Sequence, residues 1–261
     1  MKESITLSLV KVQWRHFLMV LLVVGSLAFL MLQKPFGQTA EYHNFADRRA
    51  FFGIPNFLNV ASNFAFLIVG IAGLRICLRN RLGNLRTAWI VLFAGVTLVS
   101  VGSAYYHWNP NNQTLVWDRL PMTIGFMGLF VALLGEHISE RLSVFLVPAI
   151  LVGLSSVLYW HWFDDLRFYI WVQLIPLLTI PFVMVLYRAG YSHQWLLLVA
   201  LGWYALAKIS EVADGEIFRL SQGIISGHTV KHFLSALGCL SILLMLQKRN
   251  SISSKSLPNR F

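Results

Sequence analysis

The sequence predicts an all-α membrane protein, folded as a single bundle of transmembrane helices. Of its 261 residues, 57% are hydrophobic and only 12% are charged, whereas roughly 25% of the residues of a typical soluble domain are charged. The mean hydropathy is +0.64, and apolar segments long enough to cross about 30 Å of hydrocarbon recur along the chain. Together these observations exclude an ordinary soluble protein.

Eight such segments are expected, and the linkers between them are too short to hold a soluble domain. In chain order they are 17–33, 57–78, 87–108, 120–134, 144–160, 168–187, 195–209 and 230–247. The fourth and the seventh are short for a span, so they are either tilted or longer than these limits. The first could be a signal peptide, because Lys2, Lys11 and Arg15 precede it, but it is long for that purpose and no Ala-x-Ala-like cleavage site follows. We therefore expect a retained first helix.

The distribution of basic residues predicts the orientation of the bundle. If the N-terminus is inside, the segments on the inner side contain most of the basic residues: Lys2, Lys11, Arg15, Arg75, Arg79, Arg81, Arg86, Lys248, Arg249, Lys255 and Arg260. The outer loops have fewer, and the main exceptions are Lys34, Arg48 and Arg49. The positive-inside rule then places both termini in the cytoplasm, in what we expect to be the cell (inner) membrane. The formal charge of +10 fits an anionic lipid leaflet rather than nucleic acid, because the basic residues flank apolar spans.

Polar residues gather where the third span ends and the fourth begins. Ser103 and His107 are four residues apart, so they share one helix face. Asp118 opens the predicted fourth span, shortly before Pro121, which is a favourable place for a carboxylate near a helix N-terminus. Ionisable groups at membrane depth are costly and indicate functional sites.

A second polar cluster begins the last span. His228 and His232 are also four residues apart and can chelate one metal ion, as in His-Glu-x-x-His enzymes. The alternative is a pair of interfacial histidines at a headgroup boundary. The predicted topology places His107, Asp118 and both of these histidines at the same membrane face. Three histidines with an open fourth position are typical of catalytic zinc, and Asp118 could act on the bound water.

A third cluster, Lys208-x-x-Glu211-x-x-Asp214, leads out of the seventh span. Its spacing makes Lys208 and Glu211 helical neighbours, so an ion pair is expected. The pair could support catalysis, or it could simply fix the bundle. The other histidines have no second ligand at helical spacing and are interpreted as interfacial or solvated: His16, His43, His137, His161 and His193.

These motifs together resemble the alkaline ceramidases. The resemblance rests on Ser103-x-x-x-His107, Asp118-x-Leu-Pro-Met122 and His228-x-x-x-His232, supported by Asn59-Val-Ala-Ser62-Asn63, which is similar to the first core helix of the family. That family belongs to the CREST superfamily of seven-helix membrane hydrolases, which also includes the progestin and adiponectin receptors. The resemblance covers a seven-helix hydrolase bundle (46–247). It leaves an additional N-terminal helix and linker (1–45), which suggests a branch that resembles the bacterial members, and a basic tail (248–261) that we expect to be disordered.

The resemblance also implies a role for each residue of the two clusters. His107, His228 and His232 would bind zinc, Ser103 would stabilise the oxyanion, and Asp118 would be the general base that takes a proton from water. The family hydrolyses the amide of ceramide to a sphingoid base and a fatty acid. The expected substrate and partner is therefore a membrane lipid, here a ceramide-like N-acyl lipid.

Calcium is the point at which the chain departs from the family pattern. The eukaryotic members have an acidic calcium site just before the first core helix. Here Asn56 occupies the position of one of its glutamates, and only Glu41 and Asp47 lie upstream. We therefore expect zinc, and no calcium site.

Two other classes of function are compatible with a polar cluster in a helix bundle. A receptor or signalling protein of the same superfamily would contain a structural zinc and would not hydrolyse lipids. A transporter could use a broken sixth span, which contains Pro176 and Pro181. Transporter sites, however, lie near the midplane of the bilayer, whereas this cluster is predicted at one face.

Overall fold

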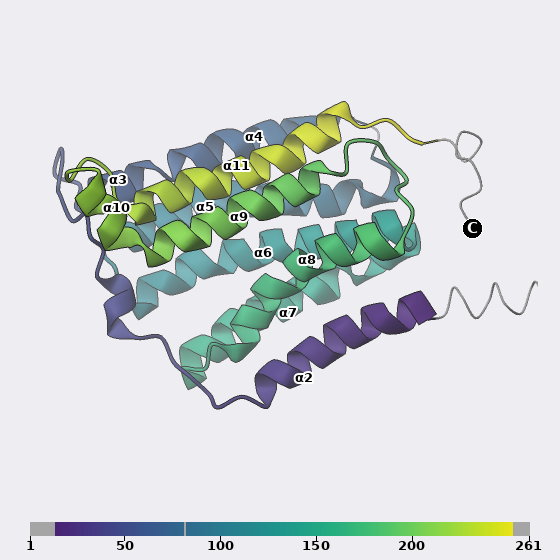
Figure 1. Cartoon of the computed structure of the whole chain (residues 1–261), viewed down its shortest axis with the longest axis horizontal. Helices are drawn as coiled ribbons and strands as arrows, with labels where there is room; N and C mark the ends of the chain where they lie inside the picture. The colour runs from purple at the N-terminus through teal and green to yellow at the C-terminus, as the bar shows by residue number, and fades with distance from the viewer. Residues whose placement is uncertain (1–13, 81, 253–261) are drawn as a thin grey trace, which may run out of the picture.

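The computed structural model describes residues 14–80 and 82–252, and these ranges fold as helices and connecting loops without a β-strand (Figure 1). The predicted all-α membrane bundle is therefore confirmed. After the N-terminal helix, the main helices are α3 (Phe57–Ala61), α4 (Phe64–Arg79), α5 (Arg86–Trp108), α6 (Asn112–His137), α7 (Leu146–Phe163), α8 (Arg167–Leu186), α9 (Leu196–Val212), α10 (Asp214–Leu220) and α11 (Gly227–Lys248). Lys2, Lys11, Arg81, Lys255 and Arg260, used above to predict orientation, lie outside the described residues.

Seven helical segments in the described part of the chain are long and apolar enough to cross a membrane. The predicted seventh span corresponds to α9, which has 17 residues. It bends by 82° into the short α10. Counting α9 with α10 as a span gives the predicted eight.

The N-terminal helix, Trp14–Met31, lies at the edge of the bundle and packs against α8 (Figure 1). It includes a π-helical turn, Leu21–Gly25, followed by α2 (Ser26–Met31). Trp171 of α8 anchors it, because its Nε1 donates to Ser26 Oγ at 3.0 Å and to the carbonyl of Val23 at 3.2 Å. Only 6% of this helix is buried, as expected for an addition to a seven-helix bundle.

Helices α5 and α6 form a closely packed antiparallel pair. A Cβ added to Gly95 would lie 2.5 Å from the backbone nitrogen of Gly125, so the close approach of the helices requires that position 95 lacks a side chain. This packing brings the end of α5, with His107, beside the beginning of α6, with Asp118.

Helix α6 begins at Asn112, well before the predicted start at Leu120. The side chain of Asn111 accepts hydrogen bonds from the backbone of Gln113 and Thr114, and Thr114 Oγ1 accepts one from the backbone of Asn111. This capping box stabilises the start of a helix within a polar stretch. Hydropathy alone does not assign that stretch to the span. The sequence predicted Asp118 at the N-terminus of this helix. In the structure, Asp118 lies in the second turn of α6.

The end of α11 differs from prediction as well. Residues 248–252 were expected to begin a disordered tail, but Arg249 is buried and pairs with Glu136 of α6. The backbone of Asn250 and Ile252 bonds to the loop that contains Gly190 and Ser192. His137, expected to be interfacial or solvated, is also buried.

One end of the bundle collects the polar residues predicted to be functional. The end of α5, the start of α6, the break between α3 and α4, the short α10 and the start of α11 all meet there (Figure 1). Exposed aromatic side chains lie at the same end of three helices, namely Trp108, Trp117, Trp162 and Phe163. Tryptophan is enriched where a membrane meets water, which agrees with the prediction that the polar cluster lies at one membrane face.

Candidate metal centre

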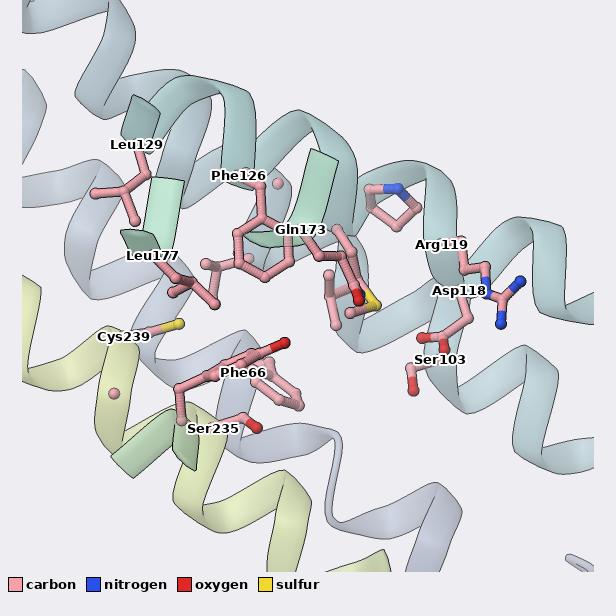
Figure 2. Close-up of a pocket in the computed structure, with 18 of the residues that line it drawn as sticks. Phe66, Ser103, Asp118, Arg119, Phe126, Leu129, Gln173, Leu177, Ser235 and Cys239 are labelled. Carbon is pink, nitrogen blue, oxygen red and sulfur yellow. The ribbon is translucent and has the colours of Figure 1, made fainter. Parts of the chain in front are cut away.

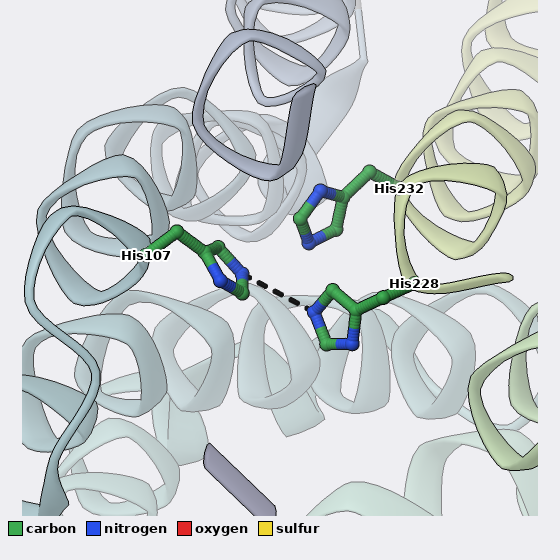
Figure 3. Close-up of side chains that lie close together, drawn as sticks. All are labelled: His107, His228 and His232. Carbon is green, nitrogen blue, oxygen red and sulfur yellow. Dashed lines mark hydrogen bonds between the residues drawn. The ribbon is translucent and has the colours of Figure 1, made fainter. Parts of the chain in front are cut away.

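Three buried histidines face one another at this end of the bundle (Figure 3). His107 lies in the last turn of α5, while His228 and His232 lie one turn apart in α11. One ring nitrogen of each lies within 4.8 Å of the others, and His107 Nε2 is 3.3 Å from His228 Nε2. Two nitrogens that bind one tetrahedral zinc at about 2.0–2.1 Å lie roughly 3.3–3.4 Å apart. The donor set therefore fits zinc.

A serine orients the third histidine. Ser62, between α3 and α4, lies with its Oγ 2.7 Å from His232 Nδ1. The same hydroxyl donates its hydrogen to the carbonyl of Asn59 at 3.2 Å, so its oxygen accepts from Nδ1–H. This assignment leaves the lone pair of His232 on Nε2, as a metal ligand requires.

Asp214 fixes the start of α11. One carboxylate oxygen accepts a hydrogen bond from the backbone nitrogen of His228 at 2.7 Å, and the other accepts from the backbone nitrogen of Ala46 at 2.8 Å. A carboxylate is favourable there because a helix N-terminus carries partial positive charge. Asp214 therefore positions His228 through its backbone and attaches the loop before α3 to the site.

The asparagine-rich segment around α3 fixes the backbone on both sides of the histidines. Asn56 Nδ2 donates to the carbonyl of His107 at 2.9 Å. Asn59 Oδ1 accepts from Thr229 Oγ1 at 2.7 Å. Phe45 covers the cluster, with its ring centroid 4.8 Å from that of His107 and 4.5 Å from that of His228. Sequence reasoning did not assign these roles to Asn56, Asn59 or Phe45, because each depends on contacts between distant segments.

Asp118 and Ser103 lie on adjacent helices and point toward each other (Figure 2). Both side chains are buried. They line a cavity of about 380 Å³, as does His232. The polar end of this cavity also contains Tyr42, Arg119, Glu211 and Lys231.

The rest of the cavity extends into the bundle and is apolar. Figure 2 shows Leu129, Leu177 and Cys239 at the end away from Asp118. Other apolar lining residues are Phe66, Leu92, Val96, Phe126, Ile180 and Ile242. The predicted base and one histidine of the predicted metal site thus lie at the polar end of a largely apolar cavity.

Charged residues next to the histidines form one network. The predicted ion pair between Lys208 and Glu211 forms. Glu211 also accepts from Lys231 Nζ at 2.6 Å and from the hydroxyl of Tyr42 at 3.3 Å. Sequence reasoning missed Lys231, which lies between the two histidines of α11 with its Nζ 3.5 Å from His228 Nε2. A lysine on an otherwise apolar helix was the available signal.

Tyr42 and Asp47, in the loop before α3, have shifted pKa values. Burial, together with the carboxylate of Glu211, raises the pKa of Tyr42 well above its ordinary value, so its hydroxyl remains a neutral donor. Burial opposes the ionisation of Asp47, but hydrogen bonds from Arg49 outweigh it and lower the pKa of this carboxyl. Both oxygens of Asp47 are bonded to the Arg49 guanidinium, at 2.8 and 2.7 Å. Glu41, the other candidate for calcium, is exposed.

Comparison with models of protein families matches residues 51–258 to the family described as Ceramidase. The match runs from the loop before α3 past the end of α11, and so includes all the helices that build the site. Comparisons with curated proteins and with solved structures gave no match. The family implies a hydrolase that acts on amide bonds, which agrees with three histidines suited to a metal and a carboxylate beside them. With four-fifths of its length matched by the model of that family, the chain belongs to the ceramidases.

Proposed function

We propose that the protein is a zinc-dependent hydrolase that cleaves the amide bond of a ceramide-like N-acyl lipid, releasing an amine and a fatty acid. His107, His228 and His232 would hold the zinc. The single observation that carries this proposal is the cavity, which joins His232, Asp118 and Ser103 at one end to an apolar channel at the other. A long acyl chain fits the apolar part and leaves its amide at the polar end.

Each polar residue then has a distinct role in the reaction. A zinc ion held by the histidines would polarise the amide carbonyl and acidify a water molecule. Asp118 takes a proton from that water as its oxygen forms a bond to the carbonyl carbon. Ser103 stabilises the negative charge that develops on the carbonyl oxygen. Asp118 then returns the proton to the nitrogen as the carbon–nitrogen bond breaks, giving the amine and the carboxylic acid.

The surrounding residues support these roles. Ser62 orients His232 and Asp214 positions His228, so both histidines are held before metal or lipid binds. Phe45 limits the access of bulk water to His107 and His228. The Lys208–Glu211–Lys231 network keeps two positive charges next to the site, where an anionic transition state forms.

The level of the site in the membrane suits a lipid substrate. The exposed aromatic side chains of α5, α6 and α7 support a position of the histidines near the headgroups, where the amide of a two-chain lipid also lies. With the termini in the cytoplasm, the site opens to the extracytoplasmic side. A reporter fused after Phe261 should then behave as cytoplasmic, and one inserted at Asn112 as extracytoplasmic.

Hydrolysis of defined lipids by purified protein tests the proposal. Zinc-loaded protein is incubated with ceramide, with other N-acyl amines and with an ester of the same acyl chain, and the products are measured by mass spectrometry. We expect release of fatty acid from the amides by the wild type and by His161→Ala, which removes an exposed histidine at the same end of the bundle. His232→Ala should be inactive. A fully zinc-loaded wild type that cleaves none of these lipids would favour the receptor alternative.

A further inference from the structure

Arg119 is a buried arginine at the polar end of the cavity, and the reaction described above does not use it. It lies next to Asp118 on α6, its residue is 5% exposed, and it lines the cavity. Its guanidinium carbon is 3.9 Å from the ring centroid of Trp160 and 4.5 Å from that of Tyr169. Stacking on two aromatic rings fixes the plane of the guanidinium.

The hydrogen bonds of Arg119 are incomplete. Its Nη2 donates to Gln38 Oε1, whereas its Nη1 is buried and has no hydrogen-bond partner. No carboxylate forms an ion pair with it among residues 14–80 and 82–252. A buried guanidinium without a counter-ion is costly, so such a group indicates an acceptor that arrives with a ligand.

The balance of charge around the cavity favours an anion over a neutral acceptor. Three basic side chains line it, those of Arg119, Lys208 and Lys231, against two acidic ones, those of Asp118 and Glu211. Glu211 is shared by both lysines. One positive charge therefore remains in excess, and a metal held by neutral histidines adds to it.

The position of Arg119 indicates which part of a lipid would meet it. Figure 2 shows Arg119 beside Asp118 and Ser103, at the opposite end of the cavity from Leu129 and Leu177. If the acyl chain occupies the apolar end and the amide lies at Asp118, the amine portion of the lipid is directed toward Arg119.

We infer that the preferred substrate is an acidic N-acyl lipid, whose amine portion carries a carboxylate or similar anionic group bound by Arg119. The paired donors of a guanidinium suit such a group, and Nη1 supplies the free donor. This inference rests on the proposed hydrolase function and specifies its substrate class. Gln38 belongs to the same subsite, since it holds Nη2.

The test compares matched lipids for binding and for hydrolysis. The probes are N-oleoylglycine, N-oleoylethanolamine and oleate, which share one acyl chain. Affinity is measured from the rise in melting temperature of the zinc-loaded protein with probe concentration, a readout that needs no turnover. We expect the wild type to bind and cleave N-oleoylglycine about tenfold to a hundredfold better than N-oleoylethanolamine, as for a hydrogen bond to a charged group.

Two variants remove this preference in different ways. Arg119→Gln removes the charge, and Gln38→Glu supplies an internal carboxylate that neutralises Arg119 and preserves its packing, so it tests the inference even if the first variant folds poorly. In both variants, the affinity for N-oleoylglycine divided by that for N-oleoylethanolamine should fall to near one, and so should the ratio of the two rates of hydrolysis. Arg141→Gln removes one exposed positive charge away from the cavity and should leave the ratio unchanged.

The possible failures are distinguishable. Equal affinity of the wild type for the two amides overturns the inference, whether or not both are cleaved. A preference that survives Arg119→Gln and Gln38→Glu overturns it too. If the variants change only the binding of oleate, Arg119 recognises the product carboxylate and the inference about the amine portion is wrong. Tight, Arg119-dependent binding of N-oleoylglycine without cleavage supports the subsite and contradicts the proposed hydrolysis.

Discussion

The two ends of the bundle each contain a buried arginine stacked on aromatic rings, but only one of the two is paired. Arg249, after α11, lies with its guanidinium carbon 4.3 Å from the ring centroid of Tyr191 and forms an ion pair with Glu136. Trp89 Nε1 donates to the same carboxylate at 3.1 Å. At the other end, Arg119 stacks on Trp160 and has no carboxylate partner in the described part of the chain.

This difference separates structural from functional polar groups. At the Arg249 end, the positive charge is paired with a carboxylate of the protein, and this pair, with Trp89, joins α5, α6 and the segment after α11. The Arg119 end combines an excess positive charge, an unpartnered donor, three clustered histidines and a cavity. A buried charge whose counter-ion belongs to the protein is held within the fold, whereas a buried charge without such a counter-ion is available to a ligand. Changes at the two ends should therefore have opposite consequences for stability and activity.

The largest effect is expected at the histidine cluster. His228→Ala removes one of three ligands of the proposed zinc, so we expect loss of most of the metal, which should be about one zinc per chain in the wild type, and loss of activity. Metal analysis of the purified protein measures this, with His161→Ala as the control. Full zinc in both His228→Ala and His232→Ala would exclude these residues as ligands.

At the end of the bundle that contains Arg249, we expect a substitution to lower stability but not activity. Arg249→Met leaves the carboxylate of Glu136, which is fully buried, without its counter-ion. Removing one partner of a buried pair costs about 3–5 kcal/mol, so the melting temperature should fall clearly, while activity per folded, zinc-loaded molecule stays near that of the wild type. Lys248→Met changes an exposed neighbouring residue and should alter neither the melting temperature nor the activity. An unchanged melting temperature of Arg249→Met would contradict the stabilising role assigned to the Arg249–Glu136 pair, and with it the contrast to Arg119.

Much of the fold could be predicted from the sequence, because the membrane imposes long apolar segments that hydropathy detects. The prediction failed where local capping or long-range packing decided the outcome. Asn111 and Thr114 start α6 within a polar stretch, and the pairing of Arg249 with Glu136 places residues of the expected tail against the bundle. Neither interaction can be predicted from the spacing of apolar residues in the sequence.

The candidate site could be predicted in part for a similar reason. Spacing places His228 and His232 on one helix face, and topology brings His107 to the same end, so the cluster follows from local rules. Ser62, Lys231 and Arg119 depend on contacts across more than one helix. Their positions follow from tertiary packing, which one sequence does not reveal.

A smaller effect is expected in the loop before α3. Asp47 is buried and bonded to Arg49, whose side chain is 54% exposed, so Asp47→Asn should destabilise the protein modestly at neutral pH. Because the pKa of Asp47 is lowered on folding, its contribution is present above about pH 4, the ordinary value for an aspartate, and is lost as the pH falls through the lowered pKa. Melting temperatures of wild type and variant at several pH values should converge in acid; a constant difference would contradict this assignment.

The smallest effect is expected for calcium. Asn56 lacks the negative charge of the glutamate that it replaces, its amide nitrogen donates to the carbonyl of His107, and Asp47 is bonded to Arg49. We therefore expect a calcium-selective chelator that spares zinc to leave the rate unchanged. A large loss that added calcium restores would show that the loop contains a calcium site after all.

The Asp118→Asn variant tests the central claim, that the end of the bundle with the histidine cluster is catalytic, most directly. Asparagine retains the size of the side chain and most of its hydrogen-bonding capacity but cannot accept the proton. We predict wild-type zinc content, a near-normal melting temperature and a rate of lipid amide hydrolysis reduced by about 10²–10⁴-fold. Loss of zinc would instead make Asp118 a metal ligand, and ordinary turnover with full zinc would contradict the proposed mechanism.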